Sequence, residues 1–347
     1  MGVLRERPLL GRMLLVATYV LAPLALEAGS YLFGSFPVAP DPLLTIEHEQ
    51  FGQDRVYDPL LFWSLKPGLQ LRGLTTNSLG LRGPEVPSKG DEFRILSLGE
   101  STTYGAKVRY EESYSVLLER RLKHVHEKPL RVINAGVSGY TIFQGYQYLV
   151  HRGVELEPDV VLTYFGFNDF LPVAYTAARD ARAGESSLGL DDRELFELRQ
   201  QPRERLHAWL ARHSNIARAI WSLVYVPPTR SEVLQSRTRV RVPPEDRWYV
   251  LEQLTAFCRE RGIQLVIVVP WYREFEGHAP LLRQFAAEHA VPMIDLPVHL
   301  AGTGERRPEY FWDAYHPNAA GHTLMTDILV MELAKTLEGA WRQEAQR

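Results

Sequence analysis

The chain has 347 residues, of which 45% are hydrophobic and 23% charged, and its formal net charge is −3. This balance predicts one large globular domain with accessory segments, and it lacks the concentrated block of lysines and arginines that a nucleic-acid partner requires. The single cysteine, Cys258, excludes an intrachain disulfide and a zinc site built from several cysteines. We expect Cys258 to be a small, buried, apolar residue.

The N-terminus carries an apolar stretch that favours a membrane anchor. Residues 13–26 contain no charged residue and follow three arginines, and after Glu27 the apolar character resumes as far as residue 36. Fourteen residues rise only about 21 Å as a helix, whereas the whole of residues 13–36 would cross the roughly 30 Å hydrocarbon core. Two alternatives stay open: a secretory signal cleaved near Ala28-Gly29-Ser30, and a buried soluble helix.

The charges around this stretch predict its orientation. The arginines precede it, whereas Asp41, Glu47 and Glu49 follow it. Because positive charge stays on the cytoplasmic side, residues 1–12 form a cytoplasmic tail and the rest of the chain lies outside the cytoplasm.

Residues 37–90 form an accessory segment ahead of the main domain. They contain aromatic residues and many turn signals, among them Lys66-Pro67-Gly68 and Arg82-Gly83-Pro84. This pattern predicts short strands and turns that pack on another part of the chain rather than a domain that folds alone.

From residue 91 to residue 338 the pattern changes to alternating strands and helices. The predicted strands lie at residues 93–98, 131–133, 160–164, 264–269 and 292–295. The predicted helices lie at residues 112–124, 246–261, 281–289 and 321–337. Nearly continuous apolar strands separated by helices indicate a parallel sheet covered on both faces. The fold class is therefore α/β, with a central parallel five-stranded sheet in a three-layer α/β/α arrangement.

An insertion at residues 171–244 separates the third strand from the fourth. Its apolar residues recur at helical spacing, for example at Leu195, Leu198, Leu206 and Trp209. A connection of this length usually has its own structure and function, so we expect a helical lid or binding subdomain.

Two segments with candidate catalytic residues follow the first two strands. Gly99-Glu100-Ser101-Thr102-Thr103 places a serine at the carboxyl end of a strand, where an open parallel sheet positions its site, although such a serine alone is more often a helix cap. Thr103 also stands where the Gly-x-Ser-x-Gly elbow of α/β hydrolases requires its last glycine. Residues 134–140 hold glycines that let the backbone approach a ligand or simply form a tight turn.

Two further segments follow the third strand and precede the last helix. In Gly166-Phe167-Asn168-Asp169 the asparagine amide can donate to a developing oxyanion or form a turn. In Asp313-Ala314-Tyr315-His316-Pro317 the aspartate can accept from Nδ1 of the histidine and leave Nε2 free to take a serine proton, or it can cap a helix beside a surface histidine. The four segments together, in this order and at these strand ends, favour a catalytic site.

These four segments resemble the consensus blocks of the SGNH (GDSL-like) hydrolases, which are named for Ser, Gly, Asn and His. The resemblance covers about residues 93–337 without the insertion. It implies a catalytic triad of Ser101, Asp313 and His316. It also implies an oxyanion hole formed by Ser101, Gly139 and Asn168.

Four further residues are candidate substrate contacts. Glu100 stands where the family motif has Asp, and since this neighbour is not a triad member, the departure concerns substrate preference. Trp271 and Tyr272 follow the fourth strand at the expected site edge, where they can stack on a sugar or pack in the rim. Arg82 can contact an anionic substrate or serve the structure, and its segment behind an N-terminal anchor resembles the layout of membrane-anchored bacterial members.

The resemblance predicts a single-pass protein of the bacterial inner membrane with a periplasmic catalytic domain, or a secreted protein if the N-terminus is cleaved. The predicted function is a serine ester hydrolase that removes or transfers O-acyl groups, above all O-acetyl, on a cell-envelope carbohydrate. An O-acyltransferase with the same site, a lipid esterase and a non-catalytic carbohydrate-binding module stay open. We expect no cofactor and no metal, because no H-E-x-x-H is present and His316 and His322 are six residues apart.

Overall fold

The computed structural model describes residues 54–71, 73–124, 128–173, 190–202 and 238–344, and the single residues 29, 206, 209, 210, 214 and 216. Within this part of the chain, no helix combines the length and apolar character that crossing a bilayer requires. The predicted anchor at residues 13–36 lies outside the described residues, except for Gly29, and therefore stays a prediction.

A sheet of five parallel strands lies at the centre of the molecule, as predicted. Its order is β6-β5-β7-β8-β9, and nearly all its residues are buried because helices cover both faces. The strands are β5 (Phe93–Gly99), β6 (Leu130–Gly136), β7 (Val160–Tyr164), β8 (Gln264–Val269) and β9 (Met293–Asp295).

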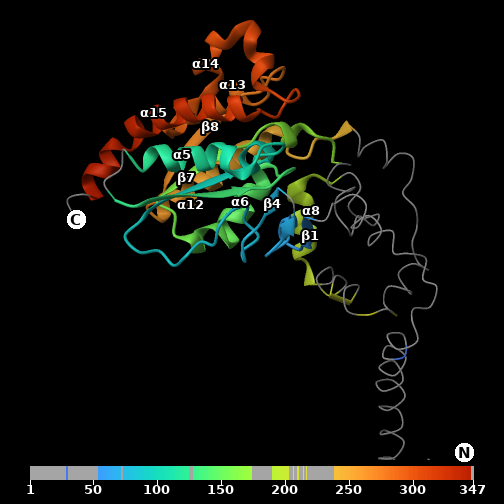
Figure 1. Cartoon of the computed structure of the whole chain (residues 1–347). Coiled ribbons are helices and arrows are strands. Elements are labelled where there is room, and N and C mark those ends of the chain that lie inside the picture. The colour runs from blue at the N-terminus through green and yellow to red at the C-terminus, as the bar shows by residue number, and fades with distance from the viewer. Residues whose placement is uncertain are drawn as a thin grey trace, which may run out of the picture.

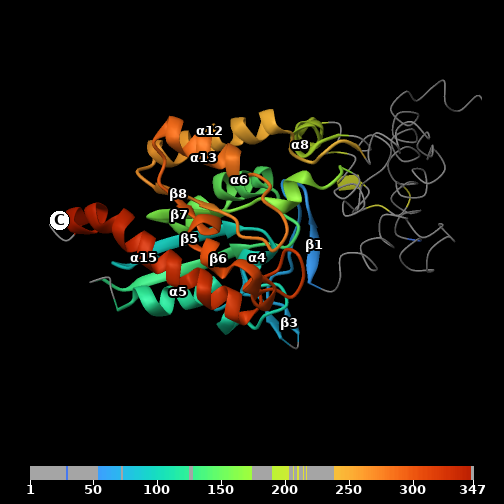
Figure 2. The same cartoon turned by 90° about the horizontal axis from the view of Figure 1, so that it is seen from above.

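Helices form a layer on each side of this sheet (Figure 2). One face is covered by α5 (Tyr114–Leu122), α15 (Ala319–Glu344) and the short α14 (Leu296–His299). The other face is covered by α6 (Ile142–His151), α12 (Pro244–Glu260) and α13 (Ala279–His289). Cys258 is buried in this second layer, as predicted, and burial raises the pKa of its thiol to about 12.

The observed boundaries differ from the predicted ones mainly at β6, α5 and α15, and α15 continues to Glu344, seven residues beyond its predicted end. The ladder between β5 and β6 continues through the pairs Ser97–Asn134 and Gly99–Gly136, so the strand extends three residues beyond its predicted end. Helix α5 begins only at Tyr114, because a 3₁₀ turn at Tyr110–Glu112 precedes it. Further 3₁₀ turns lie at Gly153–Leu156, Phe167–Phe170 and Ala301–Tyr310.

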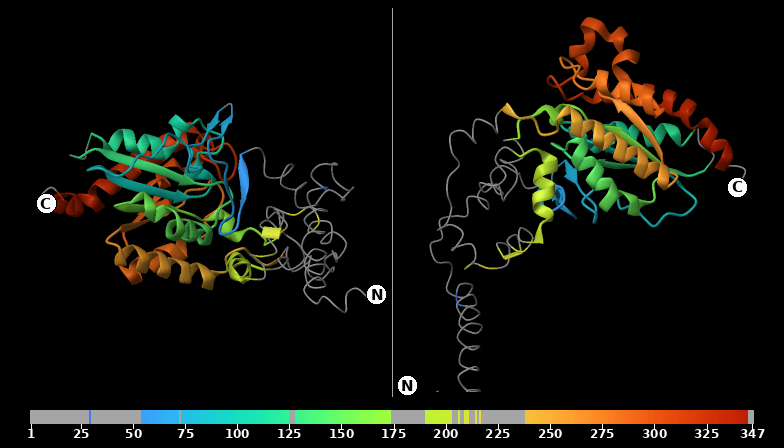
Figure 3. Two further views of the ribbon diagram at one scale, coloured as in Figure 1. Left: turned by 90° about the horizontal axis from the view of Figure 1, so that it is seen from below. Right: turned by 180° about the vertical axis from the view of Figure 1, so that it is seen from behind.

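The accessory segment packs on the α/β unit through its first hairpin. Strands β1 (Arg55–Asp58) and β2 (Phe62–Leu65) pair antiparallel, as do β3 (Gln70–Leu71) and β4 (Leu74–Thr75). Phe62 and Trp63 are fully buried in the core that α6 and α12 share. Beside this hairpin lies α8 (Asp192–Gln200), the described helix of the insertion, with Arg199 over the ring of Phe62 (Figures 1 and 3).

Candidate active site

Ser101 lies at the carboxyl end of β5, where it begins the four-residue helix α4 (Ser101–Tyr104). This helix ends at Gly105, whose φ of 80° is in the left-handed region that glycine adopts without strain. The first turn of α4 lies directly against β6, and a Cβ added at Gly136 would be only 2.1 Å from the backbone nitrogen of Tyr104. Glycine at the end of β6 therefore lets the serine-bearing turn approach the sheet.

The structure brings His316 to Ser101 although 215 residues separate them, with Nε2 of the histidine 3.0 Å from the serine Oγ. The carboxylate of Asp313 lies on the other side of the ring, 2.8 and 2.9 Å from Nδ1. The same carboxylate accepts the backbone N–H groups of Tyr315 and His316, each at 2.9 Å. These bonds close a tight turn, which fixes the imidazole between the carboxylate and the hydroxyl.

A fourth side chain, which the sequence analysis did not single out, contacts this group. Lys107 places its Nζ 2.6 Å from Oδ2 of Asp313, and its own φ is 65°. Burial of the Asp313 carboxyl raises its pKa, but the hydrogen bonds from Lys107, from the two backbone amides and from His316 outweigh burial, and the pKa falls well below its ordinary range. The Asp313 carboxylate is therefore ionised across the neutral pH range.

The contact of Lys107 contributes little to folding. A side chain in the left-handed region costs about 1–2 kcal/mol. An exposed ion pair contributes about 0–1 kcal/mol, and the Lys107 side chain is 53% exposed. Stability alone therefore does not account for a lysine held in this conformation beside Asp313.

The two other candidate oxyanion donors lie close to the same strand ends. Gly139 has a φ of 89°, and the carbonyl of the next residue, Tyr140, is 3.2 Å from Nδ2 of Asn168. The Asn168 amide also donates to Oε2 of Glu100 at 2.7 Å. The side chain of Asn168 thus links the residue after Gly139 with the residue before Ser101.

The structure corrects the predicted substrate contacts. Glu100, Trp271 and Tyr272 are 1%, 0% and 3% exposed, so none presents a surface on which a sugar can stack. The chain turns inward after Pro270, and the Trp271 ring packs 4.6 Å from that of Phe311. Tyr272 instead donates its hydroxyl to Oε1 of Glu100 at 2.5 Å. Tyr272, Glu100 and Asn168 thus form a buried hydrogen-bonded chain.

Glu100 is a buried acid whose titration we expect to appear in protein stability. Burial raises its pKa from 4.5 to about 7, with the charge of Asp169 adding to this and the Tyr272 hydrogen bond opposing it. Because the folded-state pKa is the higher one, the stability that Glu100 contributes is complete below pH 4.5 and is lost as the pH rises through 7. We therefore compare the free energies of unfolding of Glu100→Gln and the wild type, measured in urea. Relative to the wild type, the free energy of unfolding of the variant should rise by on the order of 3 kcal/mol between pH 4.5 and pH 8. An equal difference at both pH values would contradict the raised pKa.

Arg82 serves the structure rather than a substrate. It is 4% exposed, and its guanidinium donates to the carbonyls of Tyr104, Gly105 and Val108 at 2.6 to 2.8 Å. These three bonds fix the loop after α4, including the position of Lys107. The sequence Asn77–Gly83 is therefore tied to the site through the backbone that follows the serine.

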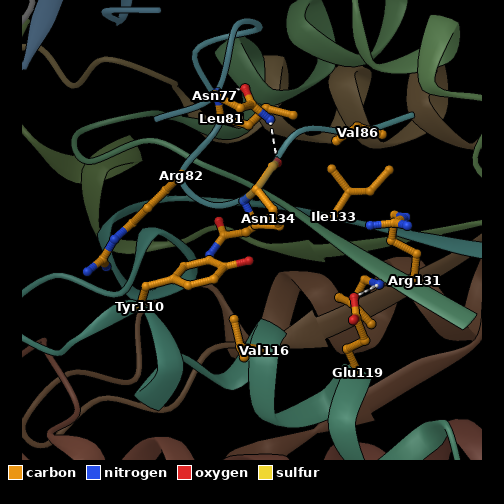
Figure 4. Close-up of a pocket in the computed structure, with 12 residues that line it drawn as sticks. Asn77, Leu81, Arg82, Val86, Tyr110, Val116, Glu119, Arg131, Ile133 and Asn134 are labelled. Atoms are coloured by element: carbon orange, nitrogen blue, oxygen red, sulfur yellow. Dashed lines mark hydrogen bonds between the residues drawn. The ribbon is translucent and has the colours of Figure 1, made fainter. Parts of the chain in front are cut away.

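A small, open pocket lies between the accessory segment and β6 (Figure 4). The Arg82 side chain runs along one side of it, with Arg131 and Glu119 on the opposite side. Neither Ser101 nor His316 lines this pocket. It is therefore separate from the candidate active site.

The ends of the insertion meet beneath the Gly139 loop. Arg241 and Asp192 form an ion pair at 2.9 Å, with side chains 0% and 1% exposed. Arg241 also donates to the Gly139 carbonyl at 2.7 Å, and Asp192 accepts the Thr141 hydroxyl at 2.8 Å. The sequence analysis missed this pair, because its members lie 49 residues apart in a segment whose arginines and acids resemble a solvated surface.

An aromatic rim accompanies the histidine loop. Trp312 directly precedes Asp313, is 60% exposed, and donates its backbone N–H to the His316 carbonyl at 2.9 Å. Tyr315 stacks on Phe167 with ring centroids 3.7 Å apart. The sequence shows that a tryptophan precedes Asp313, but it does not show that the side chain is exposed.

The model of the GDSL-like Lipase/Acylhydrolase family matches residues 97–324, and no curated protein matches the chain. Among solved structures, an alpha/beta hydrolase from the metagenome of Lake Arreo, Spain, is 18% identical, with a TM-score of 0.43 over 71% of this chain and 96% of that chain. The acetylxylan esterase Axe2 from Geobacillus stearothermophilus is 16% identical, with a TM-score of 0.43 over 72% and 95%. The lipase/acylhydrolase from Enterococcus faecalis is 17% identical, with a TM-score of 0.42 over 70% and 96%. Because the family model covers more than half of the chain, and a serine and a histidine lie in contact at the strand ends, the chain belongs to the GDSL-like lipase/acylhydrolase (SGNH hydrolase) family and is a carboxylic ester hydrolase.

Proposed function

We propose that Ser101, His316 and Asp313 are the catalytic triad of this hydrolase. The observation that carries the proposal is the unbroken contact from the Asp313 carboxylate through His316 to the Ser101 hydroxyl, at 2.8 and 3.0 Å. His316 takes the serine proton as Oγ bonds to the ester carbonyl carbon, and Asp313 stabilises the imidazolium that forms. His316 then gives this proton to the alcohol oxygen as its bond to carbon breaks. Water resolves the acyl-enzyme by the same steps in reverse order.

The tetrahedral intermediate carries a negative oxygen that needs donors. The proposal assigns this role to the backbone N–H groups of Ser101 and Gly139 and to the amide of Asn168. The support is their location after three neighbouring strands, β5, β6 and β7, with Asn168 joined to Glu100 and Tyr140. In the free protein the Asn168 amide points to these two acceptors, and the longer bond, to the Tyr140 carbonyl, is the one that an oxyanion can replace.

We further propose that the substrate is an O-acetylated carbohydrate of the cell envelope. Trp312 supports this substrate class, because it presents an exposed, flat, apolar surface one residue from Asp313. The apolar face of a sugar ring packs on such a surface. The charge pattern around residues 13–36 supports a membrane-anchored bacterial protein with its catalytic domain in the periplasm.

The test of the proposed chemistry is hydrolysis of p-nitrophenyl acetate by the full-length protein and by its Ser101→Ala variant. Turnover by the wild type that is lost in the variant supports the serine mechanism. Turnover that persists in a folded variant contradicts it. A wild type that becomes acylated but releases acetate only onto an added sugar would identify an acyltransferase.

Trp312 gives a separate prediction about the substrate. Trp312→Ala should raise KM for acetylated xylan about tenfold, the equivalent of roughly 1.4 kcal/mol of stacking, and leave p-nitrophenyl acetate turnover unchanged. Tyr249→Ala is the matched control, because Tyr249 is an aromatic residue of α12 that is also exposed. An unchanged KM in Trp312→Ala, or an equal rise in Tyr249→Ala, would remove the argument for a sugar.

A further inference from the structure

The loop that follows the nucleophile holds a lysine in a fixed and unusual place. Lys107 comes six residues after Ser101, between Gly105 and Val108, and the carbonyls of both those residues accept hydrogen bonds from the buried Arg82. The backbone of Lys107 has a φ of 65°, a conformation that residues other than glycine rarely adopt. Arg82 thus fixes the loop from its buried side, and the lysine side chain extends from its exposed side.

The side chain of Lys107 ends on the Asp313 carboxylate. Its Nζ contacts Oδ2 at 2.6 Å, the same oxygen that lies 2.8 Å from Nδ1 of His316. The other oxygen, Oδ1, accepts from two backbone amides and also contacts Nδ1 of His316. Oδ2 therefore contacts only the lysine and the imidazole. A positive charge therefore lies one carboxylate away from the ring that has to accept the serine proton.

Such a contact has two physical consequences. It fixes the rotation of the carboxylate, and so the line along which the imidazole is held. It also places a like charge near the imidazolium, so that protonating the imidazole from solvent is less favourable with the lysine present than without it. Backbone strain in a loop beside a functional group is usually retained for function. The half-exposed ion pair of Lys107 with Asp313 is too weak to offset the energy of that strain.

We propose that Lys107 is a positioning residue for the catalytic Asp313–His316 pair, and that its ammonium extends the working range of the esterase to lower pH. This inference rests on the proposed triad. Lys107 contacts neither the serine nor the imidazole in the structure, so it acts through the carboxylate. The substrate plays no part in the argument.

The other titratable groups around this pair do not supply the same charge. His322 of α15 is buried, and burial lowers its pKa to about 3, so it is neutral in the working range. The guanidinium of Arg82 is committed to three carbonyls. Among the described residues, Glu112 acts on His322, and Arg273 donates its backbone N–H to the Ala314 carbonyl while its guanidinium pairs with Glu274.

The experiment is the pH dependence of kcat/KM for p-nitrophenyl acetate in the full-length wild type, Lys107→Gln, Lys107→Arg and Lys107→Gly. In Lys107→Gln we expect the midpoint of the acid side to move upward by roughly half a pH unit, the effect of one screened charge at this separation. Lys107→Arg, which keeps the charge, should retain the wild-type midpoint. Lys107→Gly should show the same shift as Lys107→Gln while unfolding at a higher urea concentration, because glycine relieves the backbone.

The matched control is Lys123→Gln. Lys123 pairs with Glu119 at the same 2.6 Å and with a similarly exposed side chain, 50%, but it lies at the carboxyl end of α5, away from the triad. Its pH profile should equal that of the wild type. Higher ionic strength should also reduce the difference between wild type and Lys107→Gln.

The inference is overturned if Lys107→Gln keeps the wild-type midpoint, or if Lys107→Arg shifts as far as Lys107→Gln. These results leave the proposed function intact as long as Ser101→Ala removes turnover. Turnover that survives Ser101→Ala would instead overturn the proposed function itself, whatever the lysine variants do.

Discussion

His316→Ala is expected to lower kcat for p-nitrophenyl acetate by about 10⁶-fold, the same factor as Ser101→Ala, because a nucleophile without its base and a base without its nucleophile are equally ineffective. Asp313→Asn should cost less, about 10⁴-fold, since the ring stays in place but is held in the wrong tautomer. The double variant of Ser101 and His316 should be no slower than either single one. Stopped assays over hours, with the rate of uncatalysed hydrolysis subtracted, give kcat for the four variants.

Folding serves as the control for this series. The His316 side chain contacts only Ser101 and Asp313 among its hydrogen-bond partners, and the bonds of its backbone remain in the variant. Near-UV circular dichroism and urea midpoints should therefore match the wild type. A folded His316→Ala protein that keeps more than about a tenth of the wild-type kcat would exclude His316 as the base.

Arg241→Met is expected to destabilise the protein by about 3–5 kcal/mol, because it removes the buried cation that forms an ion pair with the buried Asp192 side chain. It should also lower kcat, since Arg241 no longer holds the Gly139 carbonyl and the loop loses its fixed direction. Urea unfolding measures the first effect, and kcat below the unfolding midpoint measures the second.

Two further variants separate these effects. Removing both charges, in Arg241→Met with Asp192→Leu, should recover part of the stability but not the activity, because nothing then holds the Gly139 carbonyl. Arg94→Met is the matched control: Arg94 is equally buried and paired with Glu92, but lies at the amino end of β5. It should lower stability without lowering kcat. A double variant with wild-type kcat would show that the insertion does not position the loop.

The sequence was sufficient for the fold class and for the order of the site segments, because both depend on local patterns. Buried parallel strands are continuous apolar runs, and such runs at residues 160–164 and 264–269 coincide with β7 and β8. The carboxyl ends of parallel strands lie at one edge of a sheet, so Ser101 and Asn168 had to be neighbours. The contact of Asp313 with His316 follows from their spacing of three residues.

The rest depends on side-chain direction and on contacts between distant segments, which composition and spacing do not reveal. Trp271 follows a strand at the site edge, yet its ring turns inward onto Phe311. Lys107 contacts Asp313 although 206 residues separate them. Its backbone is in the left-handed region, and the sequence does not predict this because the position is not a glycine. The Arg241 contact with Gly139 spans 102 residues.

The most direct test of the central claim is covalent trapping of the nucleophile. The full-length protein would be treated with a fluorophosphonate probe, digested and examined by mass spectrometry, beside Ser101→Ala and His316→Ala. We predict one adduct per chain on Ser101, no adduct in Ser101→Ala, and labelling in His316→Ala that is slowed as strongly as turnover. An adduct on another residue, or ester turnover by a wild type that the probe never labels, would contradict the account.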